Sequence, residues 1–184
     1  TLTGEDNDGD GIEDDNELIR TKIKEIIGEL EDSKKNLYTD NCILNSVLNI
    51  KYSAAQVADI KIESNIFVPK YMNIDYGDMG VLFGNLLDNA IEANQGVDRK
   101  KRWINVSVKY EEHILIINIK NSKIRGSRRK KKGYLNHGIG LNSVKQIVEK
   151  FNGIVEVQDF GEMYEVSAIL YGICDDKDLG KSVL

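Results

Sequence analysis

The chain has 184 residues, of which 41% are hydrophobic and 30% charged, with a formal net charge of −5, as is ordinary for a soluble globular protein. No apolar run approaches the roughly 18–20 residues that span a bilayer, and the acidic N-terminus excludes a secretory signal peptide. The first residue is Thr1 rather than Met, which predicts a piece of a longer protein. Cys42 and Cys174 match no metal-ligand spacing, so we expect free thiols in a reducing cytosol rather than a disulfide.

Residues 1–16 are rich in Gly and Asp and lack apolar periodicity, which predicts an acidic flexible connector. Alternating carboxylates, a glycine for a turn and a final glutamate are also what a Ca²⁺-binding loop requires, and the segment resembles a thrombospondin type 3 or EF-hand loop. The calcium ligands would be Asp6, Asp8, Asp10, Asp14 and Glu17. We favour the connector, because a single unpaired loop is unusual in a cytosolic setting.

Two helices are predicted next. An apolar stripe recurs every three or four residues between positions 17 and 36, so this segment should be an amphipathic helix that packs against another helix. A second helix, capped by Thr39 or Asp40, should run to about Ala58. Its apolar side consists of Ile43, Leu44, Val47, Leu48 and Ile50.

The rest of the chain alternates between strand and helix patterns. We expect strands at 60–68, 103–110, 114–119, 154–159 and 163–171, and helices at 75–94 and 141–151. The nearly all-apolar segment 114–119 is typical of a central strand, and Phe160-Gly161 should form the turn of a hairpin. This order predicts an α/β fold, a two-layer sandwich of a mixed sheet with helices on one face.

Three polar side chains share one face of the expected helix at 75–94. Asn85, Asn89 and Glu92 follow one another at i, i+4 and i+7, whereas the opposite face is apolar. Asn is a poor helix former because its amide competes for backbone hydrogen bonds, so two of them one turn apart indicate a function. An amide oxygen is a hard neutral ligand that suits a Mg²⁺ ion shared with nucleotide phosphates. A solvated polar face is the alternative interpretation.

A Gly-rich segment, His137-Gly138-Ile139-Gly140-Leu141-Asn142, lies where the expected helix at 141–151 begins. Glycines allow backbone N–H groups to approach a phosphate, and the N-terminus of a helix adds its dipole. A single Gly-x-Gly motif is explained equally well by an ordinary turn that binds no phosphate. Its place after a strand and a basic loop favours phosphate binding.

Together these residues carry a family resemblance. Asn85-x-x-x-Asn89-Ala resembles the N box of the GHKL superfamily (gyrase, Hsp90, histidine kinases and MutL), and Gly138-x-Gly140-Leu141 resembles its G2 box. The resemblance covers residues 38–171 and implies the Bergerat ATP-binding fold. It is greatest to the quorum-sensing kinases of the accessory-gene-regulator or VirS type, because the segment 38–49 is similar to theirs.

The resemblance implies a set of site residues. Asn89 and Asn85 would hold Mg²⁺, Asn121 would bind the adenine, and the G2 box, from Gly138 through Gly140 to Leu141, would contact the phosphates of ATP. Most GHKL proteins have Asp at the position of Asn121. An amide oxygen still accepts a hydrogen bond from the adenine amino group, although the charged acceptor makes the stronger bond.

Two further departures bear on the reaction. Many histidine kinases carry Lys or Arg at the position of Glu92. The hydrolysing branches of the superfamily have a Glu at the position of Asn85, where it activates water, and an amide cannot accept that proton. This favours a kinase over an ATPase.

Seven of the ten residues from 123 to 132 are Lys or Arg. The resemblance makes residues 122–137 the ATP lid, whose cations, including Arg128, Arg129 and Lys130, would neutralise the triphosphate on closure. The alternative is a nucleic-acid or membrane patch. Because the cations are confined to one loop without aromatic residues and the net charge is negative, we predict no nucleic-acid binding.

The sequence thus predicts the ATP-binding catalytic domain of a two-component sensor histidine kinase, with ATP and Mg²⁺ as cofactors and a response regulator as partner. The domain should span 38–172, after a remnant of a dimerisation region at 17–37 and before a polar tail at 173–184. The parent protein would be a homodimeric, membrane-anchored bacterial kinase, with this part in the cytoplasm.

The phosphoacceptor is expected outside the chain, because neither His113 nor His137 lies on a helix of the dimerisation type. We therefore expect no autophosphorylation by the chain alone. Two alternatives remain: a serine kinase of the anti-sigma-factor type, and a degenerate GHKL domain that binds a partner but no nucleotide.

Overall fold

The structure is a computed structural model that describes residues 36–126 and 139–174. The connector, the calcium-loop carboxylates and nearly all of the helix predicted at 17–36 lie outside these residues. The helices are α2 (Cys42–Val57), α3 (Tyr76–Asn94) and α4 (Ile139–Lys150), with a short 3-10 turn, η1 (Arg99–Lys101). The strands are β1 (Lys61–Phe67), β2 (Trp103–Glu111), β3 (Ile114–Ser122), β4 (Ile154–Asp159) and β5 (Met163–Tyr171).

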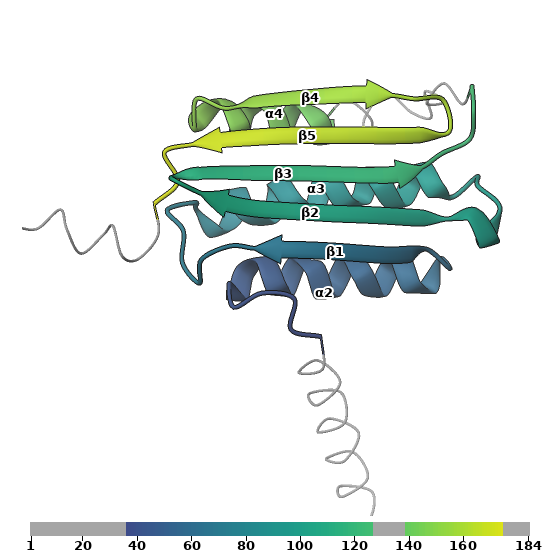
Figure 1. The fold of residues 1–184 in the computed structure, drawn as a ribbon, viewed down its shortest axis with the longest axis horizontal. Coiled ribbons are helices and arrows are strands. Elements are labelled where there is room, and N and C mark those ends of the chain that lie inside the picture. Colours follow the sequence, from purple (N-terminus) through teal and green to yellow (C-terminus); the bar gives the residue numbers. More distant parts are fainter. Residues whose placement is uncertain (1–35, 127–138, 175–184) are drawn as a thin grey trace, which may run out of the picture. The chain divides into compact units, whose positions relative to one another are not determined.

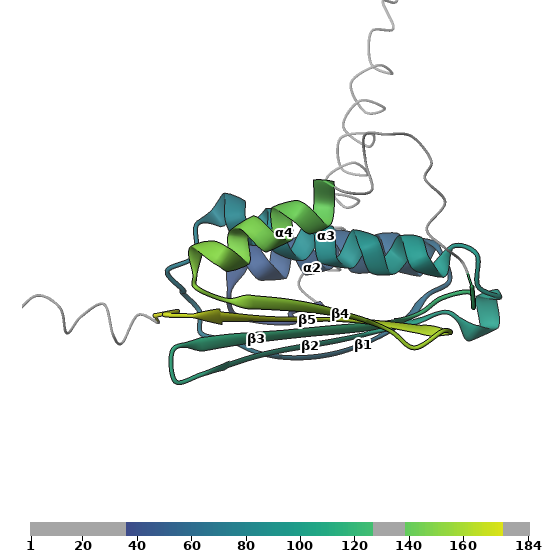
Figure 2. The ribbon, with the colours of Figure 1, turned by 90° about the horizontal axis from the view of Figure 1, so that it is seen from above.

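The five strands form one mixed sheet in the order β1-β2-β3-β5-β4 (Figure 1). β1 and β2 are parallel, and the other neighbouring pairs are antiparallel. All three helices lie on one face of the sheet, so the fold has two layers (Figure 2). The predicted α/β two-layer sandwich is therefore confirmed, and β3 is the central strand, as its apolar run predicted.

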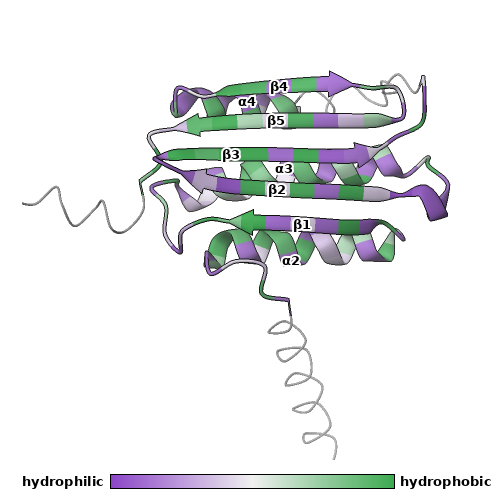
Figure 3. Ribbon diagram, viewed as in Figure 1, coloured by the Kyte–Doolittle hydropathy of each residue, from purple (hydrophilic) through white to green (hydrophobic). Residues whose placement is uncertain are grey.

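The core lies between the sheet and the helices. Alternate residues of β2 and β3 point into it, and along β2 Figure 3 shows this alternation as changes of hydropathy. The fully or almost fully buried strand residues are Ile104, Val106, Val108, Leu115, Ile117 and Ile119. Ile116, on the opposite side of β3, is 37% exposed, because no helix of the described part of the chain covers that face. We call this uncovered side the open face of the sheet.

The predicted N-cap of the second helix was wrong by one or two residues. The N-cap of α2 is Asn41, whose side-chain oxygen accepts a hydrogen bond from the backbone N–H of Leu44 at 3.0 Å. Thr39, one of the two predicted caps, instead accepts from the N–H of Asn41 at 3.2 Å. A run of neighbouring polar residues offers several possible caps, and only the path of the backbone selects among them.

Two described residues beyond the predicted boundary at 172 pack against the domain. Ile173 is fully buried, and its N–H donates to the carbonyl of His113 at 2.9 Å. Cys174 exchanges hydrogen bonds with the backbone N–H and the side chain of Asn73. Cys174 and Cys42 are both free, as predicted. Among the described residues, no helix is long and apolar enough to cross a membrane.

The C-terminal end of α4 is joined to β4 by Asn152 and Gly153. Asn152 has φ 49°, in the left-handed region, and the N–H of Gly153 donates to the carbonyl of Val148 at 2.9 Å. A Cβ atom at Gly153 would lie 2.1 Å from the backbone oxygen of Ile169. Only glycine permits this close approach, so the residue fixes where α4 ends against β5.

Candidate nucleotide-binding site

The structure brings the N box and the G2 box together. Asn85 lies in the middle of α3, and Gly140 lies in the first turn of α4, which packs alongside α3. A Cβ atom at Gly140 would lie 3.2 Å from Asn85 Oδ1 and 3.5 Å from Asn85 Cγ. The backbone of the Gly-rich segment therefore contacts the first asparagine of the polar face, although 54 residues separate them in the chain (140 minus 85, less one).

The polar residues of α3 point in two directions. Asp88 faces α2, where Lys51 Nζ lies 2.7 Å from its carboxylate. Asn85 faces α4, and both Asn85 and Asn89 are half-buried, whereas Glu92 is exposed. The face that carries the two predicted metal ligands is therefore distinct from the face that packs against α2.

Asn121 occupies the C-terminal end of β3. It is only 2% exposed and lies on the same side of the strand as Ile117 and Ile119, so its side chain points toward the helices. Its Nδ2 donates to the carbonyl of Ser122 at 3.0 Å. The side-chain amide is thereby oriented, and Oδ1 is the atom left to accept a hydrogen bond from a ligand.

Asn94 joins the elements that carry these residues, and sequence reasoning missed it. The side chain is fully buried at the end of α3. Its Nδ2 donates to the carbonyls of Ala90 at 2.9 Å and Trp103 at 3.3 Å. Its Oδ1 accepts from the N–H of Trp103 at 3.2 Å and from the hydroxyl of Ser122. Asn94 thus fixes the end of α3 to the start of β2 and to the end of β3, beside Asn121.

The base of the predicted lid is anchored. Lys123 donates through its backbone N–H to the carbonyl of Glu162 at 2.9 Å and through its ammonium group to Asp159. Its ammonium group also lies 5.8 Å from the ring centre of Tyr164. The Lys123 hydrogen bond, with one from the Gly161 N–H, lowers the pKa of Asp159. Lys123 is one of the seven basic residues between 123 and 132, and its ammonium group binds the β4–β5 hairpin.

Several predicted site residues lie outside the described residues: Gly138, Arg128, Arg129, Lys130 and His137. Leu141 is described and is partly buried against the core at the start of α4. His113 lies in the turn between β2 and β3 at the opposite end of β3 from Asn121, and its Nδ1 is 3.3 Å from the carbonyl of Ile173.

The arrangement fits a magnesium ion that arrives with a nucleotide. Within residues 36–126 and 139–174, no group of three or more His, Cys, Asp or Glu side chains is placed to hold a metal ion. The candidate protein ligands are neutral amide oxygens. Such a donor set suits a Mg²⁺ ion that keeps several waters and takes its charge neutralisation from phosphates.

Comparison with known proteins identifies the family. The family model of the GHKL domain matches residues 74–170, more than half of the chain. No curated protein matches significantly. The catalytic domain of histidine kinase ThkA is similar in structure, with a TM-score of 0.56 and 16% identity over 74% of this chain and 92% of that one.

Two other histidine kinases have a similar fold. Histidine kinase AdeS of Acinetobacter baumannii has a TM-score of 0.54 and 14% identity over 84% of each chain. Full-length ShkA in complex with AMPPNP has a TM-score of 0.55 and 15% identity over 74% of this chain and 31% of that one. The family model spans both α3 and α4, the helices that bring Asn85 and Gly140 into contact. The chain therefore belongs to the GHKL domain family and has the fold of histidine kinase catalytic domains.

Proposed function

We propose that the chain binds Mg-ATP beside α3, the first turn of α4 and the end of β3, and that it transfers the γ-phosphate to a histidine outside residues 1–184. The observation that carries this proposal is the contact of Gly140 with Asn85, which unites a Gly-rich helix start with the polar face of α3. The AMPPNP bound by ShkA, a protein of similar fold, supports a nucleotide as the ligand.

Different residues of the site would bind different parts of ATP. Asn121 Oδ1 would accept a hydrogen bond from the adenine amino group, since its Nδ2 is engaged by the Ser122 carbonyl. The backbone around Gly140 would approach the phosphates at the N-terminus of α4, where N–H groups and the helix dipole favour an anion. Base and phosphates would thus be held by separate elements, and Asn94 joins the one that carries Asn121, β3, to α3, which carries Asn85 and Asn89.

Asn89 and Asn85 would hold the metal ion, with Asn89 the principal ligand. Mg²⁺, when bound, supplies charge neutralisation to the phosphates. Asn85 lacks the carboxylate that would make water a nucleophile, so the site protects ATP from hydrolysis until an acceptor arrives. A kinase requires this property, and a hydrolysing enzyme does not.

We place the acceptor outside the chain, because His113, the histidine among the described residues, is remote from Asn121. Asn121 follows Ile114 by seven positions along the extended strand, which corresponds to about 23 Å at the rise of a β-strand. His113 precedes Ile114, so it lies at the far end of the sheet. Radioactive γ-phosphate that accumulates as acid-labile phosphate on His113 or His137 of the purified chain would contradict the proposal.

The resemblance of residues 38–49 to quorum-sensing kinases supports a finer assignment. We propose a two-component response regulator as the downstream partner and a homodimeric, membrane-anchored bacterial kinase as the parent protein. The catalytic domain would then work in the cytoplasm.

We predict that Mg-ATP raises the melting temperature of the chain, because a ligand that binds only the native state stabilises it by about 2.7 kcal/mol at a hundredfold excess over Kd. Asn89→Ala should weaken binding of Mg-ATP more than binding of ATP in EDTA. Asn65→Ala, an exposed asparagine on β1, provides the control and should change neither. The absence of a thermal shift at millimolar nucleotide would contradict the proposal. If Asn89→Ala weakened the affinity for ATP equally with and without Mg²⁺, Asn89 would not be a ligand of the metal ion.

The lid cations should act on the triphosphate alone. Replacing Arg128, Arg129 and Lys130 together by Ala is expected to weaken ATP binding by about tenfold or more and to leave adenosine binding unchanged, because adenosine has no phosphate. Isothermal titration with both ligands measures the difference. A triple replacement of Lys61, Lys109 and Lys120, which lie on the open face, controls for net charge. If ATP and adenosine weaken by the same factor, these cations act on the fold or on a partner.

A further inference from the structure

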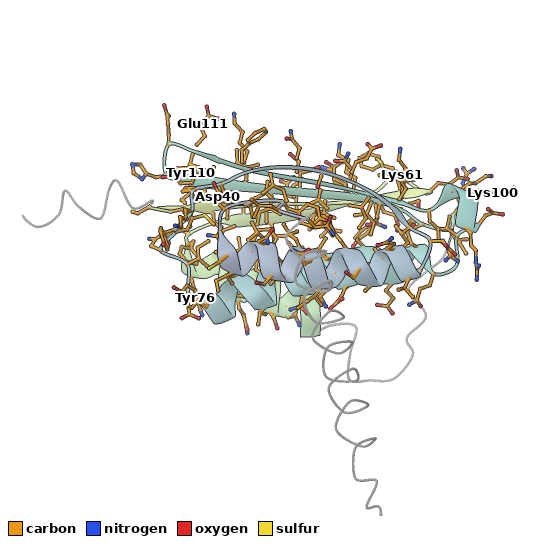
Figure 4. The ribbon with its side chains drawn as sticks, turned by 90° about the horizontal axis from the view of Figure 1, so that it is seen from below. Asp40, Lys61, Tyr76, Lys100, Tyr110 and Glu111 are labelled. Atoms are coloured by element: carbon orange, nitrogen blue, oxygen red, sulfur yellow. The ribbon has the colours of Figure 1, made fainter. Side chains whose placement is uncertain are left out.

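A hollow of about 360 Å³ lies where β1 and β2 begin, on the side of the sheet opposite the side chain of Asn121. Its walls include Lys61 and Glu63 of β1, Lys100 and Lys101 of η1, and Arg102 and Trp103 at the start of β2. Figure 4 shows Lys61 and Lys100 at the same end of the sheet, with Tyr110 and Glu111 at the other end. We call this surface the basic hollow.

The basic hollow opens on the open face of the sheet. Lys61 pairs in register with Trp103, and Glu63 pairs with Asn105. These residues alternate with Ile62 and Ile104, which pack into the core beneath the helices. Because successive side chains of a strand point to opposite faces, the hollow and Asn121 lie on opposite sides of the sheet. A ligand in the hollow would therefore not compete with a nucleotide for space.

The charges in the hollow are mostly uncompensated. Lys61 lies 2.7 Å from Glu63, the one carboxylate among the lining residues. Lys100 and Lys101 form no ion pair with a described residue. Arg102 donates only to neutral backbone carbonyls, those of Ala58 at 2.7 Å, Val97 at 2.8 Å and Gln95 at 3.1 Å. Because Lys61 is paired with Glu63 and Arg102 with backbone carbonyls, Lys100 and Lys101 are the two cations of the hollow without an acidic partner among the described residues.

The hollow is also held rigidly. The carbonyls bound by Arg102 follow the ends of α2 and α3, so its guanidinium is fixed between two helices. The N–H of Trp103 donates to Asn94 Oδ1 at 3.2 Å and to Ser122 Oγ at 3.1 Å. A site whose walls are fixed before binding loses less conformational entropy when a ligand arrives. The half-buried indole adds an apolar wall among the cations.

We propose that the basic hollow binds an acidic segment of a partner protein, with carboxylates against Lys100 and Lys101 and an apolar side chain against Trp103. Charge complementarity carries this choice. Nucleic acid is the less suitable polyanion, because Glu63 would repel its dense phosphate charge more strongly than the separate carboxylates of a peptide. The surface is independent of the proposed nucleotide site, which lies on the other side of the sheet.

Trp103 is the one tryptophan of the chain, so its fluorescence reports on the hollow directly. The probe is a synthetic octapeptide of three Glu, three Asp and two Leu, titrated in low salt against the full chain. We expect a saturable change of fluorescence, with binding weakened about tenfold in Lys100→Gln/Lys101→Gln. Lys109→Gln/Lys120→Gln removes the same charge from the same face outside the hollow and should retain binding to within about twofold.

Three outcomes would overturn the proposal: no saturable signal at millimolar peptide, equal losses in the two double variants, or an oligothymidylate that binds more tightly than the peptide and depends on the same two lysines. Equal losses would mean attraction by net charge alone, and tight oligothymidylate binding would make the hollow a nucleic-acid site. Thermal shift with Mg-ATP is measured on both variants. It should match that of the unaltered chain, which separates failure of this proposal from failure of the nucleotide site.

Discussion

Gly153→Ala is expected to destabilise the domain by about 3 kcal/mol or more, the largest effect of any single methyl group. The added Cβ would lie 2.1 Å from the carbonyl oxygen of Ile169, 2.8 Å from Val148 Cγ1 and 2.9 Å from the Val148 carbonyl oxygen. Two of these neighbours are backbone atoms, one in β5 and one in α4. Neither can move without breaking the packing of α4 on the sheet.

Urea denaturation followed by circular dichroism measures the loss in Gly153→Ala. The matched control is Gly80→Ala in α3, where an added Cβ meets no atom within 4 Å. That variant should gain about 0.5–1 kcal/mol, because Ala favours the helix interior. The same substitution thus has opposite signs at the two positions. If the two variants were equally stable, the close approach of Gly153 to β5 would be wrong.

Asn94→Ala should cost about 2–4 kcal/mol. The change removes four hydrogen bonds and leaves the carbonyl of Trp103 and the hydroxyl of Ser122 without their buried partner. Burial of an unpaired polar group costs its full desolvation free energy, which is why the loss exceeds that of an exposed hydrogen bond. Asn65→Ala removes the same side chain from an exposed position and should stay within about 0.5 kcal/mol.

A second measurement on Asn94→Ala tests its role as a positioning residue. Since Asn94 holds Ser122, and Asn121 precedes it on β3, adenosine binding should weaken at a temperature where the variant remains folded. Binding of inorganic triphosphate, which would contact the proposed phosphate site at the start of α4, should change less. Equal weakening of both ligands, or none, would show that Asn94 stabilises the fold without orienting the adenine side of the site.

Local patterns in the sequence were sufficient for most of the elements. The helix period of 75–94 and the alternation of 103–110 match α3 and β2 to within one residue at each end. The hairpin strands 154–159 and 163–171 match β4 and β5. These features depend on neighbours within a few positions, where periodicity and turn residues are informative. The N-cap of α2 was missed because several adjacent polar residues compete for that position.

The residue types of the nucleotide site were also visible in the sequence. Two asparagines on one helix face and a Gly-x-Gly before a second helix predicted phosphate and metal chemistry, and the GHKL family model spans both motifs at residues 74–170. What the motifs alone did not determine was their contact. Asn85 and Gly140 meet because α3 and α4 pack side by side on the sheet.

The sequence by itself therefore determined the elements, their order and the chemistry of the motifs, whereas the tertiary structure decided which side chains act together. Asn94 is one more polar residue at a helix end until β2 and β3 bring it three hydrogen bonds, two with the backbone of Trp103 and one with the hydroxyl of Ser122. The basic hollow exists because parallel pairing sets Lys61 beside Trp103. Such contacts join residues far apart in the chain, and their free energy depends on the packing of the whole sheet, which no local window of sequence contains.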